Sequence, residues 1–582
     1  MRLDRGHRGV QPIDLVFRFG GESGEGVISC GEIFAQAAAR AGREIYTVRT
    51  FPAEIRGGHA VYQVRVGDDL LLSQGDRVDV LVAFNGEGYE KGLPDLRPGG
   101  ILVCDGDQVT PDPSFDGTAY PIPFTTLARD QVGSLRAKNM VVLGAVAELF
   151  DLPREVLFSL VAQRFARKGE EAQEANRRAL EAGAAYVRDH VTKQDPYRIG
   201  TGPHTGRVVL SGNEAVALGA LAAGLTFFAG YPITPASDIM ENLVRWLPQV
   251  GGRLVQAEDE IAALAMVLGA SFGGARAMTA TSGPGLSLMV ELLGLASAAE
   301  LPAVVVDVQR AGPSTGMPTK EEQGDLNLAV WGAHGEGPRI VLGATSVADA
   351  FQTTVQAFDL AERYQCPVIV LSDQFLGFRK ASVAPPPVDE IRPSYRILAR
   401  RNGAYRRFQL TESGISPAAV PGMVGLQHVI TGLEHDEFGR PAYDPARRTQ
   451  MMAKRARKMA LAAQEPGMTR RWGHPEPVLG VLGWGSQEGV IREAVARANR
   501  EGYRVAALHT RMLWPLPHGE IRAFLRQVKA VLVPEVNFSG QFANLLRTQF
   551  TIEPHRLTKS DGLPFRPVDI YEKIKEVYPD GR

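Results

Sequence analysis

The sequence predicts a multidomain α/β protein. Its 582 residues exceed what one hydrophobic core organises, and about 100 to 200 residues per domain implies roughly three to five domains. Short apolar runs alternate with segments of helical periodicity along most of the chain, a pattern typical of parallel sheets covered by helices on both faces. The 64 Lys and Arg residues balance 65 Asp and Glu residues, so net charge indicates no nucleic-acid or membrane partner.

The cysteines and the N-terminus narrow the class further. Cys30, Cys104 and Cys366 lie far apart, so we expect neither a disulfide framework nor a metal or iron–sulfur cluster of CxxC type on this chain. The N-terminus lacks an apolar signal segment, and no run approaches the roughly 18 apolar residues of a membrane-spanning helix. We therefore expect a cytoplasmic protein.

The first domain, expected over residues 1–192, opens with a strand, a glycine-rich turn and a helix. A strand over Ile13 to Phe19 leads into the run Gly20-Gly21-Glu22-Ser23-Gly24-Glu25-Gly26, and a helix is predicted from Val27 to Ala41. Backbone N–H groups and the positive end of such a helix can bind a phosphate. The glycine order differs from the dinucleotide fingerprint G-x-G-x-x-G, and a tight turn without a ligand explains the same residues equally well. Further elements are expected at Val61 to Val66, Val78 to Phe84, Ile101 to Cys104 and Glu170 to Val187.

A polar segment rich in Gly and Pro, residues 193–207, reads as a linker to a second domain over 208–384. Its predicted strands are Val208 to Leu210, Thr226 to Ala229, Arg253 to Gln256, Arg276 to Thr281, Ala303 to Val308, Arg339 to Leu342 and Val368 to Leu371. Open α/β sheets bind ligands beyond the carboxyl ends of their strands. The sequence therefore directs attention to the segments that follow these strands.

Four such segments carry candidate functional residues. They are Gly230-Tyr231-Pro232-Ile233-Thr234-Pro235, Gln256-Ala257-Glu258-Asp259-Glu260, Thr281-Ser282-Gly283-Pro284-Gly285 and Arg310-Ala311-Gly312-Pro313-Ser314-Thr315-Gly316. Glu258 precedes a helical pattern and should lie near a helix N-terminus. Taken singly, each motif has a plain structural explanation: a glutamate that caps a helix contributes roughly 0.3 to 1 kcal/mol, and the proline segments form rigid turns.

The rest of the chain divides at Pro385-Pro386-Pro387. Residues 385–475 read as a linker and irregular insert, in which His435 beside two carboxylates is interpreted as a polar loop. The basic run Lys454, Arg455, Arg457 and Lys458 predicts a solvated helix face, with docking of a partner as the alternative. Residues 476–582 return to an α/β pattern, with strands at Val478 to Leu482, Val505 to His509 and Ala530 to Pro534.

The order and spacing of these motifs resemble the α subunit of 2-oxoacid:ferredoxin oxidoreductases. The interval from Glu258 to the Thr281 turn is similar to that of the pyrimidine-binding domain of thiamine diphosphate enzymes, and the Tyr231 and Arg310 segments narrow the resemblance to this family. The first domain resembles the family's γ domain, and the last resembles the C-terminal domain of transketolases. The implied fold is a parallel-sheet pyrimidine-type domain between these two.

The resemblance implies a role for each candidate residue. Glu258 would hydrogen-bond the aminopyrimidine ring of thiamine diphosphate, with Glu260 as the rival carboxylate. The implied cofactor contacts are Tyr231, Pro232, Ile233, Glu258, Thr281, Ser282 and Gly283, and the implied substrate contacts are Thr234, Arg310 and Thr319. The planar, charged fork of Arg310 suits a carboxylate, either the one beside the keto group or a distal one. Coenzyme A would contact Gly21, Ser23, Gly24, Gly26 and Arg56, although an ordinary solvated or ion-paired side chain explains Arg56 about as well.

Two parts of the family's machinery are not found in the sequence. No Gly-Asp-Gly followed by Asn is present to hold Mg²⁺ and the diphosphate, and no cysteine cluster is present to hold a [4Fe–4S] centre. The resemblance therefore implies a β subunit that carries both, an (αβ)₂ heterotetramer, and electron transfer to ferredoxin. The expected reaction is the coenzyme A-dependent oxidative decarboxylation of 2-oxoglutarate to succinyl-CoA, chiefly because a γ module fused to α resembles the two-subunit 2-oxoglutarate enzymes. Three alternatives stay open: the same chemistry on pyruvate or another 2-oxoacid, a non-redox thiamine diphosphate decarboxylase, and a nicotinamide-dependent dehydrogenase.

Overall fold

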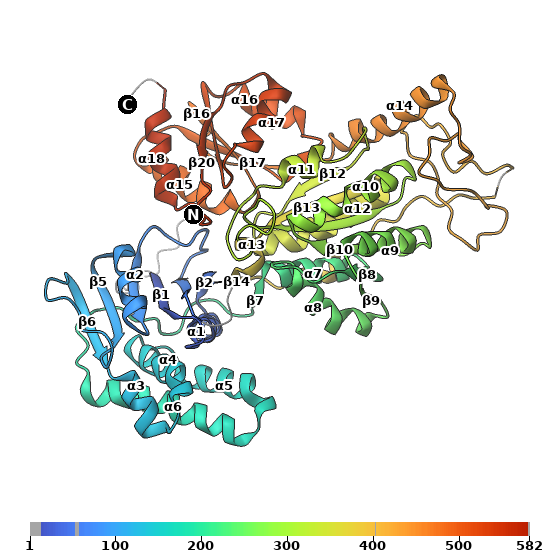
Figure 1. Cartoon of the computed structure of the whole chain (residues 1–582). Coiled ribbons are helices and arrows are strands. Elements are labelled where there is room, and N and C mark those ends of the chain that lie inside the picture. The colour runs from blue at the N-terminus through green and yellow to red at the C-terminus, as the bar shows by residue number, and fades with distance from the viewer. Residues whose placement is uncertain (1–12, 53–56, 402, 580–582) are drawn as a thin grey trace. The chain divides into compact units, whose positions relative to one another are not determined.

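The structure is a computed structural model that describes residues 13–52, 57–401 and 403–579 (Figure 1). These residues form two compact units, each of which is described by itself. Unit 1 runs to Leu210 and includes Arg379–Pro385, whereas unit 2 comprises Ser211–Phe378 and the chain from Pro386 onward. Both units contain β-sheets covered by helices, which confirms the predicted α/β class.

The described part of unit 1 is built on an eight-stranded sheet in the order β6-β5-β4-β1-β3-β2-β14-β7. β1 is parallel to β4 and antiparallel to β3, so the sheet is mixed. The strands are β1 (Asp14–Glu22), β2 (Glu44–Thr50), β3 (His59–Gly67), β4 (Val78–Ala83), β5 (Leu96–Asp105), β6 (Gly117–Ile122), β7 (Val208–Ser211) and β14 (Lys380–Val383).

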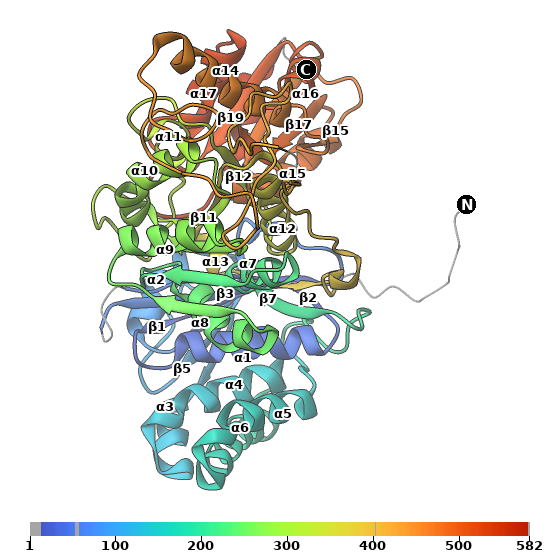
Figure 2. The same ribbon diagram turned by 90° about the vertical axis from the view of Figure 1, so that its right-hand side faces the viewer.

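Alternation along β1 explains how the helices of unit 1 divide between the two faces. Phe17 and Phe19 point to one face and pack in a cluster with α1, α4, α5 and α6, which lie together in Figure 2. Val16 points to the other face, where it packs with Leu81 of β4 and with Tyr89 of α2. The helices are α1 (Val27–Arg40), α2 (Gly86–Gly92), α3 (Phe124–Leu127), α4 (Lys138–Leu149), α5 (Arg154–Phe165) and α6 (Glu170–His190).

In the described residues of unit 2, a seven-stranded sheet has the order β18-β12-β13-β11-β10-β8-β9. Its strands are parallel except β18, and β11 and β13 are buried at every position, as expected of a parallel sheet covered on both faces. The strands are β8 (Phe227–Gly230), β9 (Arg253–Gln256), β10 (Ala277–Thr281), β11 (Ala303–Gln309), β12 (Ile340–Gly343), β13 (Pro367–Asp373) and β18 (Met512–Trp514). Helices α7 (Gly212–Ala222), α8 (Ser237–Trp246) and α12 (Val347–Tyr364) pack together, and so do α9 (Glu260–Phe272), α10 (Gly283–Ala298) and α11 (Leu326–Trp331).

A second sheet of unit 2 is formed near the C-terminus, with the order β15-β17-β16-β19-β20. Helices α15 and α18 cover one face, and the residues of α16 and α17 share a hydrophobic cluster with α9, α10 and α11 of the first sheet. The elements are β15 (Thr469–Gly473), β16 (Leu479–Trp484), α15 (Glu488–Arg500), β17 (Val505–Thr510), α16 (His518–Leu525), β19 (Ala530–Glu535), α17 (Gln541–Phe550), β20 (His555–Thr558) and α18 (Pro567–Val577).

Strand β7 corrects one expectation, because the sequence assigned Val208 to Leu210 to the sheet of the second domain. The structure instead places β7 at the edge of the unit 1 sheet, beside β14, which returns from beyond β13. β14 is held there by pairing of Ala381 with Tyr46 and by a 2.8 Å hydrogen bond from Lys380 N to Thr47 Oγ1. A four-residue apolar run does not specify its sheet, because its hydrogen-bonding partners are remote in sequence.

Helix α14 (Pro445–Ala462) corrects a second expectation, because its basic residues are not a solvated face. Lys454 and Lys458 are 0% and 1% exposed, and both Nζ atoms lie 2.5 Å from carboxylate oxygens of Glu300. Lysines four residues apart share one helix face and can reach the same remote carboxylate. His435 lies in a loop, as expected, but it is buried, and its Nε2 is 3.1 Å from the carbonyl oxygen of Ala298.

No helix within the described residues has the length and apolarity that crossing a bilayer requires. Cys30, Cys104 and Cys366 are buried, and burial raises the pKa of each thiol, so all three stay protonated at neutral pH.

Candidate functional site

Four adjacent parallel strands of unit 2 bring the sequence motifs to one edge of the sheet. β9, β8, β10 and β11 are neighbours in that order, and each is followed by one of the motif segments. The strand ends are level, because Gly230 pairs with Gln256 and Thr281 pairs with Asp307. The loops from Gly230, Gln256, Thr281 and Gln309 therefore meet at the edge where open α/β sheets bind ligands.

The loop after β8 is held rigidly by main-chain contacts. Ala257 N donates to Gly230 O at 2.9 Å, and Asn213 Nδ2 donates to Pro235 O at 2.9 Å. Tyr231 and Pro232 are exposed and Ile233 is half-buried, so this loop presents an aromatic ring and a proline to whatever binds at the edge.

Arg310 lies at the end of β11 and is oriented toward the loop after β8. Its Nη1 donates to Thr234 O at 2.6 Å, so the sequence-predicted pair Arg310 and Thr234 is brought together. Burial lowers the pKa of Arg310 while the charge of Asp325 opposes that shift. A hydrogen bond from Ala311 N to Lys320 O closes the loop that follows, which returns the buried Thr319 to the neighbourhood of Arg310.

The acidic residues before α9 have three different environments. Asp259 caps the helix, because its Oδ1 accepts from Ala262 N at 2.7 Å. Glu258 is exposed, whereas Glu260 is 6% exposed and faces the turn after β10. A Cβ added to Gly285 would lie 2.6 Å from Glu260 Oε1 and would also overlap Thr281 Oγ1. The carboxylate that the fold packs against the Thr-Ser-Gly-Pro-Gly turn is therefore that of Glu260.

The turn itself is closely packed. Thr281 and Ser282 are fully buried, and α10 begins at Gly283 with Ser282 as its N-cap. A Cβ on Gly283 would lie 2.7 Å from Asp325 Oδ2, so a larger residue there would displace the Asp325 carboxylate. Glu260, which packs against this turn, and Glu258, two residues before it, carry carboxylates of the kind that can hydrogen-bond an aminopyrimidine ring.

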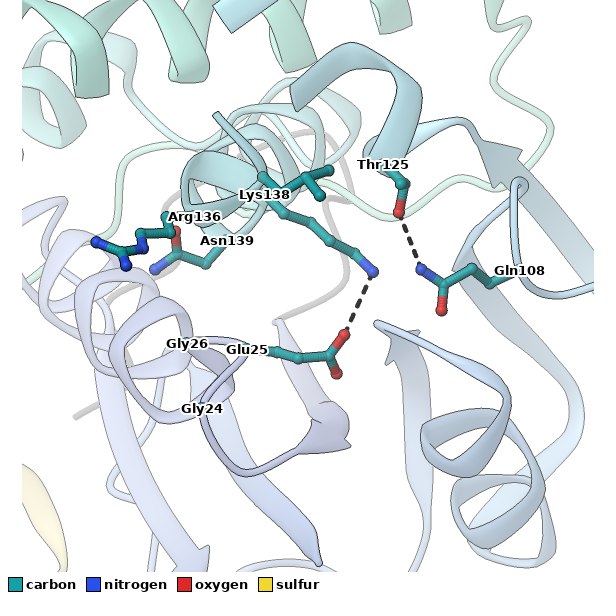
Figure 3. A pocket seen from close by; sticks show the side chains of 9 residues that line it. Gly24, Glu25, Gly26, Gln108, Thr125, Arg136, Lys138 and Asn139 are labelled. Carbon is teal, nitrogen blue, oxygen red and sulfur yellow. Dashed lines mark hydrogen bonds and ion pairs between the residues drawn. The ribbon is translucent and has the colours of Figure 1, made fainter. Parts of the chain in front are cut away.

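Unit 1 contains a separate cavity of about 550 Å³ beside the glycine-rich turn (Figure 3). It brings together two of the predicted coenzyme A residues, Gly24 and Gly26. Gly21 serves packing, since an added Cβ would lie 2.8 Å from Phe84 Cβ, and Ser23 N bonds to Gly58 O at 2.9 Å. Arg56 lies outside the described residues. The lining residues are Gly24, Glu25, Gly26, Gln108, Thr125, Leu135, Arg136, Lys138 and Asn139.

The charges of this cavity are partly paired, as Figure 3 shows for Lys138 and Glu25. Lys138 Nζ lies 2.8 Å from Asp105 Oδ2 and 3.5 Å from Glu25 Oε1, so its charge is shared among carboxylates. Arg136 is exposed at the rim. Sequence reasoning missed Arg136, Lys138 and Asn139 as lining residues, although an N-terminal Lys-Asn pair on a buried helix was a signal for them.

Within the described ranges, no three His, Cys, Asp or Glu side chains are grouped so as to hold a metal ion.

Comparison with known proteins agrees with this arrangement. The thiamine diphosphate-binding model of pyruvate flavodoxin/ferredoxin oxidoreductases matches residues 218–454. The pyruvate ferredoxin/flavodoxin oxidoreductase model matches residues 16–186, and core domain II of pyruvate:ferredoxin oxidoreductase matches residues 479–556.

Relatives match over nearly the whole chain. The 2-oxoglutarate oxidoreductase subunit KorA of Mycobacterium tuberculosis is 35% identical over 97% of this chain and 91% of its own, and the α subunit of 2-oxoacid:ferredoxin oxidoreductase 2 of Aeropyrum pernix is 32% identical over 98% of both. The structure of the 2-oxoglutarate:ferredoxin oxidoreductase from Magnetococcus marinus, with 2-oxoglutarate, coenzyme A and succinyl-CoA bound, is 46% identical, with a TM-score of 0.93, over 97% of this chain and 99% of that one. The chain therefore belongs to the 2-oxoacid:ferredoxin oxidoreductase family.

Proposed function

We propose that this chain is the α subunit, with a fused γ module, of a 2-oxoglutarate:ferredoxin oxidoreductase. The reaction is the oxidative decarboxylation of 2-oxoglutarate with coenzyme A to give succinyl-CoA, carbon dioxide and two electrons for ferredoxin. The observation that carries the proposal is the 46% identity and TM-score of 0.93 to the Magnetococcus marinus enzyme, which holds 2-oxoglutarate, coenzyme A and succinyl-CoA. Convergence of the Thr234, Glu260, Thr281 and Arg310 segments on one sheet edge supports it.

The test is purification of the native complex followed by assay. We expect coenzyme A-dependent reduction of ferredoxin or a viologen with 2-oxoglutarate, and a lower kcat/KM with pyruvate or 2-oxobutyrate. A complex that prefers pyruvate would overturn the substrate assignment while leaving the reaction class. Activity without coenzyme A or an electron acceptor would instead support a non-redox decarboxylase.

The proposed cofactor is thiamine diphosphate, which would supply the chemistry of decarboxylation when bound. Glu258 was selected from the sequence as the residue that exchanges a proton with the aminopyrimidine. The burial of Glu260 and its contact with the Thr281 turn favour Glu260 instead. Tyr231, Pro232 and Ile233 are proposed to cover the ring from the loop after β8.

Matched substitutions decide between the two carboxylates. If Glu260 is the partner, Glu260→Gln should lower kcat by about 10² to 10⁴-fold, whereas Glu258→Gln should change it little, since general acid–base contacts contribute in this range. Melting temperature and subunit assembly serve as controls for both variants. The opposite ranking would restore Glu258 to the role.

For the substrate, we propose that the guanidinium of Arg310 binds a carboxylate and that the hydroxyls of Thr234 and Thr319 add hydrogen bonds. Arg310 already donates through Nη1 to Thr234 O, which orients the rest of the fork. This carboxylate is either the one beside the keto carbon or the distal one of a dicarboxylate. The substrate specificity of Arg310 variants distinguishes the two.

We propose a β subunit as the partner that completes the site with Mg²⁺, the diphosphate contacts and a [4Fe–4S] centre, in an (αβ)₂ heterotetramer that reduces ferredoxin. The apolar faces of α9 and α10 beside the site support this proposal. Ile261 and Met266 of α9 and Leu288 of α10 are 46%, 40% and 50% exposed, and between Ile261 and Phe272 α9 carries no charge. Exposed apolar patches of this kind mark protein interfaces.

Substitution of Met266 by Arg tests that surface. We expect Met266→Arg to prevent co-purification of the partner and of its iron, because a charge placed in an apolar interface is desolvated without a counter-ion. Val424→Arg is the matched control, since Val424 is 76% exposed on another segment of the same unit. Retention of the partner by both variants would locate the interface elsewhere.

We further propose a γ domain at 1–192 and a linker at 193–207, followed by a pyrimidine-binding domain that spans Ser211–Phe378, because Val208–Leu210 and Arg379–Pro385 belong to unit 1. An insert then precedes a transketolase-like C-terminal domain, whose sheet begins at β15. The cavity beside Gly24 and Gly26 is the proposed contact for coenzyme A phosphates, with Arg136 at its rim. Arg136→Ala should raise the KM for coenzyme A without changing that for 2-oxoglutarate. A cytoplasmic location is proposed from the three unpaired thiols.

A further inference from the structure

Two carboxyl groups lie side by side behind the candidate site. Asp307 stands in the apolar strand β11, level with Thr281 of β10, and is fully buried. Asp325 immediately precedes α11 without a capping hydrogen bond from its side chain, and its Oδ2 would lie 2.7 Å from a Cβ on Gly283. The two aspartates thus connect strand β11 with the first residue of α10.

Buried carboxyl oxygens of the two aspartates lack hydrogen-bond donors. No N–H or O–H of the described residues donates to either carboxylate oxygen of Asp307 or to Oδ2 of Asp325. A proton shared between the two carboxyl groups would satisfy these buried oxygens. Burial, and then the charge of Asp325, raises the pKa of Asp307 well above its usual range, and burial, followed by the charge of Glu322, raises the pKa of Asp325 to about 6.

The main chain of Asp325 is fixed by the residue that precedes Arg310. Asp325 N donates to Gln309 Oε1 at 3.0 Å, and Gln309 Nε2 donates to Ser372 O at 2.8 Å. Burial lowers the pKa of Arg310, and the negative charge of Asp325 partly offsets that lowering. Gln309 therefore links Asp325 to the residue whose guanidinium we assign to the substrate.

The other charged groups around the pair are already engaged. Glu322 Oε2 accepts from Gly312 N at 3.0 Å, and Asp373 accepts from Gln323 Nε2 at 3.0 Å and from Leu376 N at 2.8 Å. Glu260 packs against Thr281 and Gly285. Among the described residues that face the pair, Arg310 is the cation that responds to its charge.

We propose that Asp307 and Asp325 share one proton and act as positioning residues for Arg310, so that binding of the 2-oxoacid carboxylate depends on the charge of the pair. With the shared proton present, the pair carries one negative charge and Arg310 can bind a substrate carboxylate. When that proton is released to solvent, a second negative charge competes with the substrate for the same guanidinium. This inference rests on the proposed role of Arg310.

Asp307→Asn tests the proposal, because asparagine keeps the shape of the aspartate side chain and its amide can always donate to Asp325. The variant cannot lose the shared proton, so the pair never acquires a second negative charge. We expect the KM of the wild-type complex for 2-oxoglutarate to rise tenfold or more toward the alkaline end of a series from about pH 6 to 10, with kcat following its own profile. In Asp307→Asn the KM should stay flat over the alkaline half. A variant with the wild-type alkaline rise in KM overturns the proposal. Asp325→Asn repeats the test if Asp307→Asn does not fold.

Thermal unfolding separates this inference from the proposed function, because it needs no substrate. A raised pKa gives a contribution to stability that is present at low pH and is lost as pH rises through the folded pKa. The melting temperature of Asp307→Asn minus that of wild type should therefore increase with pH. Asp349→Asn is the control with the opposite sign, because Arg511 and Arg470 outweigh burial and lower the pKa of Asp349. If this difference in melting temperature increases with pH but the complex has no 2-oxoacid activity, the carboxyl pair is supported and the proposed function is rejected. If the difference does not change with pH, the proposal that the two carboxyl groups share a proton is rejected.

Discussion

Gly285→Ala is the most direct perturbation of the candidate site, because it adds one methyl group between Glu260 and Thr281. The new Cβ would lie 2.6 Å from Glu260 Oε1, well inside van der Waals contact, and Thr281 Oγ1 is closer still. Overpacking of this kind costs about 1 to 3 kcal/mol. The higher helix propensity of alanine offsets up to about 1 kcal/mol, so the net loss of folding stability should be about 0 to 3 kcal/mol.

The effect on activity should be much larger than the effect on folding. The added methyl group forces the Glu260 carboxylate away from the turn, and the loss of a general acid–base contact lowers kcat by about 10² to 10⁴-fold. Gly294→Ala on the same helix is the matched control: an added Cβ there has no atom within 4 Å, so it should leave kcat unchanged and raise stability slightly. The measurements are kcat of the complex, thiamine diphosphate affinity by titration, and melting temperature. Equal kcat in the two variants would refute the placement of Glu260.

Three further predictions follow from buried charges and from the proposed substrate. Glu300→Gln should destabilise unit 2 by about 3 to 5 kcal/mol, because it leaves Lys454 and Lys458 buried without a counter-ion. Glu291 of α10 is exposed, so Glu291→Gln should not destabilise the unit. Urea unfolding measures the stability of both variants. Burial raises the pKa of Glu300, but the charges of Lys458 and Lys454 together outweigh burial and lower it. The stabilisation that Glu300 provides is therefore present above its ordinary pKa of 4.5 and is lost on acidification. Below that pH, the melting temperature of Glu300→Gln should fall less than that of wild type. If Arg310 binds the carboxylate beside the keto group, Arg310→Lys should reduce kcat/KM for 2-oxoglutarate and 2-oxobutyrate equally. If it binds the distal carboxylate, the variant should narrow the ratio of kcat/KM for 2-oxoglutarate to kcat/KM for 2-oxobutyrate. Each tenfold change corresponds to about 1.4 kcal/mol.

The central sheet was predictable because its strands are buried on both faces. Arg253 to Gln256 was expected and is found as β9. β10 and β11 differ from expectation by one residue at one end, and β8 is shifted by one residue. Dense apolar runs between helical segments carry this signal locally. For the same reason, the carboxyl-end positions of the Tyr231, Thr281 and Arg310 segments followed from the sequence.

The features that sequence reasoning missed depend on partners far away in the chain. The lysines of α14 look solvated until Glu300 is placed against them, and β7 looks like the start of the second sheet until β14 is paired beside it. Asp307 did leave a local signal, as a single acid in the strand Ala303–Gln309. Its meaning required Asp325, which another loop supplies.

Helix capping explains why neighbouring acids before α9 should have different roles. A helix N-terminus needs one acceptor for its free N–H groups, and Asp259 provides it by bonding Ala262 N. Glu260, the first residue of the helix, is therefore not needed as a cap, and its side chain packs against the turn that begins α10. Glu258 precedes the cap and is exposed beside the apolar face of α9, where a partner chain would cover it. If the partner subunit instead brings Glu258 to the ring, Glu258→Gln will reduce activity only in the assembled complex, and thiamine diphosphate binding by the isolated chain will not distinguish it from wild type.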